Sequence, residues 1–122
     1  MNALIETITT QDPEKRDRPF GALCASMPSA QLLEVCEELE RFRRDAANLY
    51  ERVRATLFLY AAYRFFLTES EAAATLGAIP HDGFVDFLER RFERAIERFR
   101  RELRRAGPNG AILSALAETY HH

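Results

Sequence analysis

Residues 30 to 67 lie within the longest stretch of the chain without glycine or proline, and their apolar side chains recur at alternating steps of three and four. These positions are Leu32, Val35, Leu39, Phe42, Ala46, Leu49, Val53, Tyr60, Tyr63 and Leu67, with Thr56 as a polar member. The spacing predicts a helix, and Ser29 is a suitable N-cap. A straight helix of this length would reach about 55 Å, whereas a compact domain of this size is about 35 Å across. We therefore expect one long central helix that either breaks near Asp45–Asn48 or projects and pairs with another copy or domain.

Glycines and prolines divide the rest of the chain into shorter segments. We expect a short helix within residues 1–11 with Asn2 as its cap, a charged connector over residues 12–21, and one or two helical turns before Pro28. Thr68 and Glu71 form a capping-box pattern that predicts a further short helix over residues 69–76.

A helix is also expected from Gly83 to Arg105, with Asp82 as its N-cap and Gly107 at its end. Its predicted buried stripe is Phe84, Leu88, Phe92, Ala95, Ile96, Phe99 and Leu103. A last helix, capped by Asn109, is expected to bury Ile112, Leu113, Leu116 and Tyr120. No long run alternates with period two, so the predicted fold class is all-α: a bundle of about four to six helices around the central one. We expect a single domain over residues 1–122, either a whole protein or the N-terminal part of a longer one.

The composition is that of a soluble globular protein, with 47% apolar residues, 30% charged residues and a net charge of −2. Cys24 and Cys36 are too few for a disulfide framework, and we interpret them as buried thiols in a reducing compartment. The first residues lack the basic and long apolar regions of a signal peptide, so we expect a cytoplasmic protein.

No catalytic motif is apparent. The sequence contains neither a glycine-rich phosphate loop nor the motifs of zinc proteases and serine hydrolases. Its histidines are His81, His121 and His122, for which no complete set of metal ligands can be assembled from the sequence. We therefore predict a protein that is not an enzyme and needs no cofactor or metal.

An arginine-rich face is the most distinctive charged feature. Residues 89 to 105 contain eight arginines and four glutamates, a local charge of +4. Its predicted members are Arg90, Arg94, Arg98, Arg101, Arg104 and Arg105. Such a face could bind phosphates, but the interspersed glutamates and the scarcity of aromatic residues argue against nucleic acid as the partner. We expect it to pair instead with the acidic segment 34–40, within the chain or across a dimer. Otherwise a solvated face is formed by Glu34, Glu37, Glu38 and Arg41. Phe87 projects toward the arginines, and we expect it to be covered by another helix or to contact a partner.

The run from Leu57 to Leu67 contains five aromatic rings and one charge, Arg64. It is too short to cross a bilayer, and a segment that is apolar nearly all round is normally buried on several sides. We expect it to pack against the N-terminal helix and the helix from Gly83 to Arg105. The alternative is a small-molecule pocket formed by Tyr60, Tyr63 and Arg64. Arg64 should either extend to solvent or meet Glu69, Glu71 or Asp86.

These observations favour a helical interaction or oligomerisation module, with a homodimer or another domain or protein as partner. Two alternatives stay open from the sequence. One is a ligand-binding domain at Tyr60, Tyr63 and Arg64, and the other is nucleic-acid binding through the arginine face.

Overall fold

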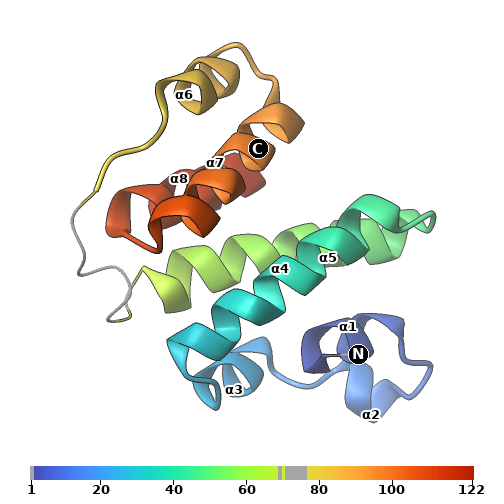
Figure 1. Cartoon of the computed structure of the whole chain (residues 1–122). Coiled ribbons are helices and arrows are strands. Elements are labelled where there is room, and N and C mark those ends of the chain that lie inside the picture. The colour runs from blue at the N-terminus through green and yellow to red at the C-terminus, as the bar shows by residue number, and fades with distance from the viewer. Residues whose placement is uncertain (1, 69, 71–76) are drawn as a thin grey trace.

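The protein is all-α, as predicted. A computed structural model describes residues 2–68, 70 and 77–122, which contain eight α-helices and one π-helical segment. The short helix predicted over residues 69–76 lies outside the described residues. Figure 1 shows a central pair, α4 and α5, with the N-terminal helices α1–α3 on one side and α6–α8 on the other.

The N-terminal third forms three short helices. Helix α1 spans Ala3–Thr9, and the side chain of Asn2 caps it by accepting a hydrogen bond from the Ile5 amide at 2.9 Å, as expected. The charged connector contains α2, Pro13–Arg16, whose proline sits in the first turn where its missing N–H costs nothing. Helix α3 spans Phe20–Ala25 and provides the one or two turns expected there.

The long central helix is broken at the predicted place. Helix α4 spans Ser29–Asp45, and α5 spans Leu49–Ala61 after Asn48, whose side chain accepts a hydrogen bond from the Glu51 amide. Ser29 is the first residue of α4 rather than its N-cap, which is Pro28. The helix continues from α5 as a π-helix, η1, over Ala62–Leu67, which the apolar spacing does not reveal.

The predicted helix from Gly83 to Arg105 is two helices, which corrects the sequence interpretation. Helix α6 spans His81–Leu88 with Pro80, not Asp82, at its N-cap, and α7 spans Phe92–Ala106. Between them Arg90 has a φ of 62°. The Arg91 amide donates to the Asp86 carbonyl at 2.8 Å and the Arg90 amide to the Phe87 carbonyl at 3.0 Å. This pattern ends α6 in a Schellman motif, with arginine at the position that usually holds glycine.

Helix α8 spans Gly110–His121 and begins as predicted, with the Asn109 side chain accepting a hydrogen bond from the Ile112 amide at 2.8 Å. Gly107, with a φ of 84°, ends α7 just before it. Helices α7 and α8 form a hairpin, and α8 is the element of that hairpin that packs along α5 and η1. The expectation that the helix from Gly83 to Arg105 covers the aromatic run is therefore wrong, because α8 occupies that place.

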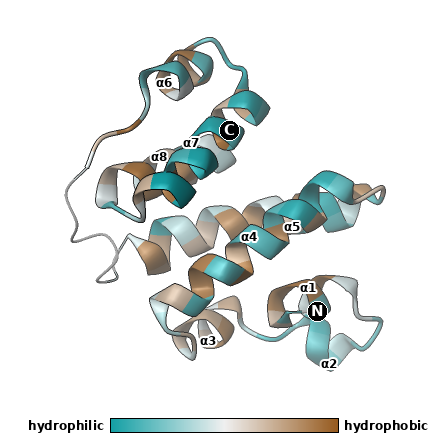
Figure 2. Cartoon of the chain, in the orientation of Figure 1, coloured by the Kyte–Doolittle hydropathy of each residue, from teal (hydrophilic) through white to brown (hydrophobic). Residues whose placement is uncertain are grey.

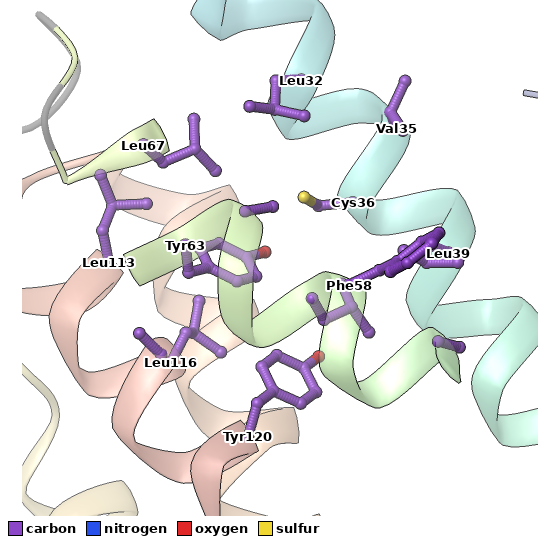
Figure 3. Close-up of a cluster of buried hydrophobic side chains, with 14 of the residues drawn as sticks. Leu32, Val35, Cys36, Leu39, Phe58, Tyr63, Leu67, Leu113, Leu116 and Tyr120 are labelled. Atoms are coloured by element: carbon purple, nitrogen blue, oxygen red, sulfur yellow. The ribbon is translucent and has the colours of Figure 1, made fainter. Parts of the chain in front are cut away.

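The core lies where α4, α5, η1 and α8 meet. Figure 3 shows side chains from all four elements converging, among them Cys36, Phe58, Tyr63, Leu116 and Tyr120. Hydrophobic and hydrophilic residues alternate around most helices, so that each helix has one face for the core (Figure 2). Both cysteines are buried and free, as expected.

The expected buried stripe after Gly83 is only partly correct. Ala95, Ile96, Phe99 and Leu103 are buried, but Phe84 is 43% exposed and Leu88 62% exposed. The turn at residues 89–91 explains the difference, because it changes the direction of α6 and takes its apolar face out of register with that of α7.

Candidate functional site

One face of α5 and η1 exposes large apolar side chains to solvent. Leu49 is 75% exposed, Val53 48%, Leu57 57% and Phe65 55%. At about 100° per residue, the first three lie within about 80° of one another around the helix. Phe65 packs edge-on against Tyr60 with ring centroids 5.9 Å apart, which joins it to the same face. We call Leu49, Val53, Leu57 and Phe65 the apolar stripe.

The borders of the apolar stripe are basic. By helical geometry, Arg52 and Arg54 each lie about 60° outside it, one on either side. Arg64 is exposed, with its guanidinium 5.6 Å from the centroid of the Phe65 ring. Three arginines against one glutamate, Glu51, give residues 49–67 a charge of +2 on a chain whose net charge is −2. Within the described part of the chain, Arg52 and Arg64 form no ion pair.

A second polar feature is buried between α4, α7 and α8. Glu40, only 1% exposed, accepts a hydrogen bond from the Tyr120 hydroxyl at 2.7 Å and from Arg43 Nε at 2.8 Å. It also accepts one from Arg44. Arg43, 4% exposed, in turn donates to both carboxylate oxygens of Glu93 on α7, at 2.8 and 3.0 Å. We call Glu40, Arg43, Glu93 and Tyr120 the buried network; the Glu93 side chain lies at its edge and is 51% exposed.

The protonation states of the buried network are fixed by its contacts. Burial alone would raise the pKa of Glu40, but the hydrogen bonds from Arg43 and Tyr120 outweigh it and hold the pKa below its usual range. The hydrogen bond from Arg43 likewise lowers the pKa of Glu93. Burial raises the pKa of the Tyr120 hydroxyl well above its usual value. Near neutral pH, Glu40 is therefore ionised and Tyr120 protonated, which is the combination their hydrogen bond requires.

Arg100 extends this charged layer along α7. It is 5% exposed and donates to Glu37 of α4 at 2.6 Å. Its Nε atom and Oε1 of Glu37 are buried and have no hydrogen-bond partner among the described residues. Arg104 also donates to Glu37, at 3.2 Å. The predicted pairing of the arginine-rich helix with the acidic segment 34–40 thus occurs within the chain. The most buried contact of this pairing is made by Arg100, which was not among the residues predicted for the arginine-rich face.

A cleft of about 330 Å³ opens beside the buried network. Its lining combines cationic, hydroxyl and aromatic groups from α4, α5, α7, α8 and the turn before α7: Arg43, Thr56, Arg90, Phe92, Glu93, Ile96, Thr119, Tyr120 and His122. The Arg43 guanidinium is already engaged by Glu40 and Glu93, so it is not available as a free anion-binding group.

The residues of the predicted aromatic pocket do not face a common space. Tyr63 is 1% exposed and stacks on Tyr120, with ring centroids 5.9 Å apart and planes inclined by 12° (Figure 3). Tyr60 is half-buried and packs on the ring of His121, whereas Arg64 extends to solvent. Asp86, one of the carboxylates expected for Arg64, is engaged by Arg91 and Arg98 instead, at 2.8 and 2.7 Å. Glu69 and Glu71 lie outside the described residues.

The predicted arginine face is divided by the turn at residues 89–91. Arg90 lies in that turn and lines clefts near α8, so it does not continue the row on α7. Arg98 is paired with Asp86, and also with Asp82 at 3.3 Å, while Arg94 and Arg101 are exposed on α7. Phe87 is half-buried and contacts the rings of Phe92 and His122.

One group of side chains in the described residues has the composition of a metal site. Glu118, His121 and His122 at the end of α8 place their donor atoms within 4.8 Å of one another. No complete set of ligands was predicted around the histidines, and Glu118 was not among the predicted site residues. The spacing of Glu118 and His121, three residues apart on one helix, was the available signal.

No described helix is long and apolar enough to cross a membrane, in agreement with the length argument made for residues 57–67. No protein-family model matches the chain, and neither a curated protein nor a solved structure is significantly similar to it.

Proposed function

We propose that this chain is a helical interaction module whose contact surface is the apolar stripe of α5 and η1. The observation that carries the proposal is the row of four large apolar side chains, each about half exposed or more, on one face of a helix that is otherwise part of the core. From Leu49 to Phe65 the row is about 24 Å long at about 1.5 Å per residue, which is enough for about four turns of a partner helix.

The charges beside the apolar stripe select the partner. A second copy of the chain would bring Arg52, Arg54 and Arg64 against the same arginines, and Glu51 is the one acid that residues 49–67 offer against them. Such close like charges oppose association, because a separation of a few ångströms lies within the screening length of about 8 Å at physiological ionic strength. We therefore infer that the partner is an amphipathic helix of another protein or domain, with an apolar seam bordered by glutamate or aspartate.

The first test measures the oligomeric state. Light scattering coupled to gel filtration should find a monomer up to about 200 μM, because like-charged borders oppose pairing. A dimer that Leu57→Glu dissociates would overturn the choice of partner and identify a second copy as the occupant of the apolar stripe.

The second test measures binding of a designed helical peptide of about 18 residues with leucines at i, i+4 and i+7 and glutamates on both flanks. The interface is small, so we expect a Kd in the micromolar range that weakens as salt is raised from about 50 to about 500 mM. Leu57→Glu should weaken binding about tenfold or more, because burying a leucine contributes about 1.5 kcal/mol or more.

Two matched controls accompany the peptide titration. Leu88→Glu changes a residue of similar exposure, 62%, on α6 away from the apolar stripe, and should bind like the unmodified protein. A peptide with lysine in place of each glutamate should bind at least tenfold more weakly. Equal binding of the two peptides, or equal losses for Leu57→Glu and Leu88→Glu, would contradict the proposal.

The alternative functions receive less support. The residues of the predicted aromatic pocket point in different directions, and the arginine face is divided and partly paired with acidic residues.

A further inference from the structure

We propose that Glu118, His121 and His122 form a binding site for a divalent transition-metal ion of the Zn²⁺ class at the end of α8. Two imidazoles and one carboxylate are donors that zinc takes readily, and three protein ligands leave a fourth position for water. The site shares no residue with the apolar stripe, although the Tyr60 ring contacts both His121 and Phe65. The proposal does not depend on the function proposed above.

The helix brings the three ligands together. Residues three and four apart lie on the same side of a helix, so Glu118 faces both His121 and His122. Helix α8 ends at His121, so the direction of the His122 side chain is not set by the regular rotation of 100° between neighbouring helical residues. This position lets two adjacent histidines direct their donor atoms toward one carboxylate.

The distances fit a tetrahedral ion after a small adjustment. Ligand atoms about 2.1 Å from zinc lie about 3.4 Å from one another in a tetrahedral site. Glu118 Oε1 and His122 Nε2 are already 3.2 Å apart. The whole donor set lies within 4.8 Å, so the largest closure needed is about 1.4 Å, which rotation of exposed side chains supplies.

Aromatic packing holds both imidazoles near the site. The ring of His122 stacks on Phe92 of α7 with centroids 5.4 Å apart and planes inclined by 10°. It also meets the edge of Phe87 at 5.5 Å. The ring of His121 packs on Tyr60 of α5 at 5.2 Å. Side chains that are already restrained lose less conformational entropy on binding, which favours coordination.

The test is titration of the full chain with Zn²⁺ by calorimetry and with Co²⁺ by visible absorption. We expect one ion per chain with a Kd of about 10 μM or tighter, and a Co²⁺ spectrum of the intensity typical of four-coordinate sites. Glu118→Gln should weaken binding about tenfold, and His122→Asn more, because each removes one of three protein ligands. The chain's remaining histidine provides the control, and His81→Asn should leave the affinity unchanged.

Three results would overturn the proposal. One is a Kd weaker than about 100 μM for the unmodified chain. Another is equal affinity of the unmodified chain and Glu118→Gln, which would leave only a histidine pair. The third is an equal loss in His81→Asn, which would indicate non-specific binding. The Leu57→Glu variant should bind Zn²⁺ normally, which separates this site from the apolar stripe.

Discussion

Replacing Glu40 by glutamine keeps the shape of the side chain and removes its charge from the buried network. Glu40 is 1% exposed and accepts hydrogen bonds from Arg43, Arg44 and Tyr120. The substitution leaves Arg43, itself 4% exposed, with Glu93 as its one remaining carboxylate partner in the buried network. Removing one member of a buried ion pair typically costs about 3 to 5 kcal/mol. Because Glu93 still compensates part of the charge, we expect the lower end, about 3 kcal/mol of unfolding free energy.

Urea denaturation at pH 7, followed by circular dichroism, measures this loss. With a slope of about 1.5 kcal/mol per molar urea, a loss of about 3 kcal/mol moves the midpoint by about 2 M without changing the slope. Glu93→Gln is the matched control, because Glu93 binds the same guanidinium but has a side chain that is 51% exposed. It should cost about 1 kcal/mol or less.

The comparison between the two variants decides whether burial matters. A loss below about 1 kcal/mol for Glu40→Gln would refute the account, since an uncompensated buried charge would then cost no more than an exposed one. Equal losses for Glu40→Gln and Glu93→Gln would refute it as well. A smaller loss in a Glu40→Met/Arg43→Leu double variant than in Glu40→Gln would support it, because apolar side chains remove both charges together.

Two further predictions concern acid stability and the turn at Arg90. The pKa values of Glu40 and Glu93 are lowered in the folded protein, so their contribution is complete above the unfolded value of about 4.3 and is lost as the pH falls through the folded values. At pH values below about 4.3 the urea midpoint should therefore decrease as the pH is lowered, and it should decrease less steeply in Glu93→Gln. An identical decrease in that variant would contradict the contribution assigned to Glu93. Arg90→Gly should raise the unfolding free energy by about 0.5 to 1 kcal/mol, because glycine adopts a positive φ without steric cost. Arg94→Gly, inside α7, should lower it by about 1 kcal/mol, and a loss in both variants would contradict this explanation.

The sequence predicts the parts of the fold that depend on local signals. Asn2 and Asn109 cap helices because their side chains reach amides three residues ahead, and Gly107 ends α7 with a positive φ. The break near Asp45–Asn48 followed from a different argument, the mismatch between helix length and domain size.

The second helix break could not be predicted in this way. Arginine has no special preference for a positive φ, so nothing in residues 83–105 signals that Arg90 ends α6. Helical periodicity assumes one continuous helix, and it therefore placed Phe84 and Leu88 in the core. The aromatic run posed a related difficulty, because a segment that is apolar nearly all round does not show which face its neighbours will leave exposed.

The buried charged contacts likewise depend on residues that are distant in the sequence. Glu37 and Glu40 resemble the solvated acids of an ordinary helix until α7 and α8 bring Arg100 and Tyr120 to them. Sequence spacing identified that acidic segments and arginines would pair, but not which arginines would be buried in doing so.

This pairing explains why the borders of the apolar stripe are basic. The inward-facing acids of α4 are engaged by arginines of α4 and α7, so they do not neutralise α5. Arg52 and Arg64 therefore have no acidic partner among the described residues, although the chain as a whole carries a charge of −2. A partner with acidic flanks would complete both the apolar and the electrostatic contacts of α5, whereas a second copy would complete only the first. Reversing the charge with Arg52→Glu/Arg64→Glu should accordingly exchange the preference, so that the lysine-flanked peptide binds better than the glutamate-flanked one.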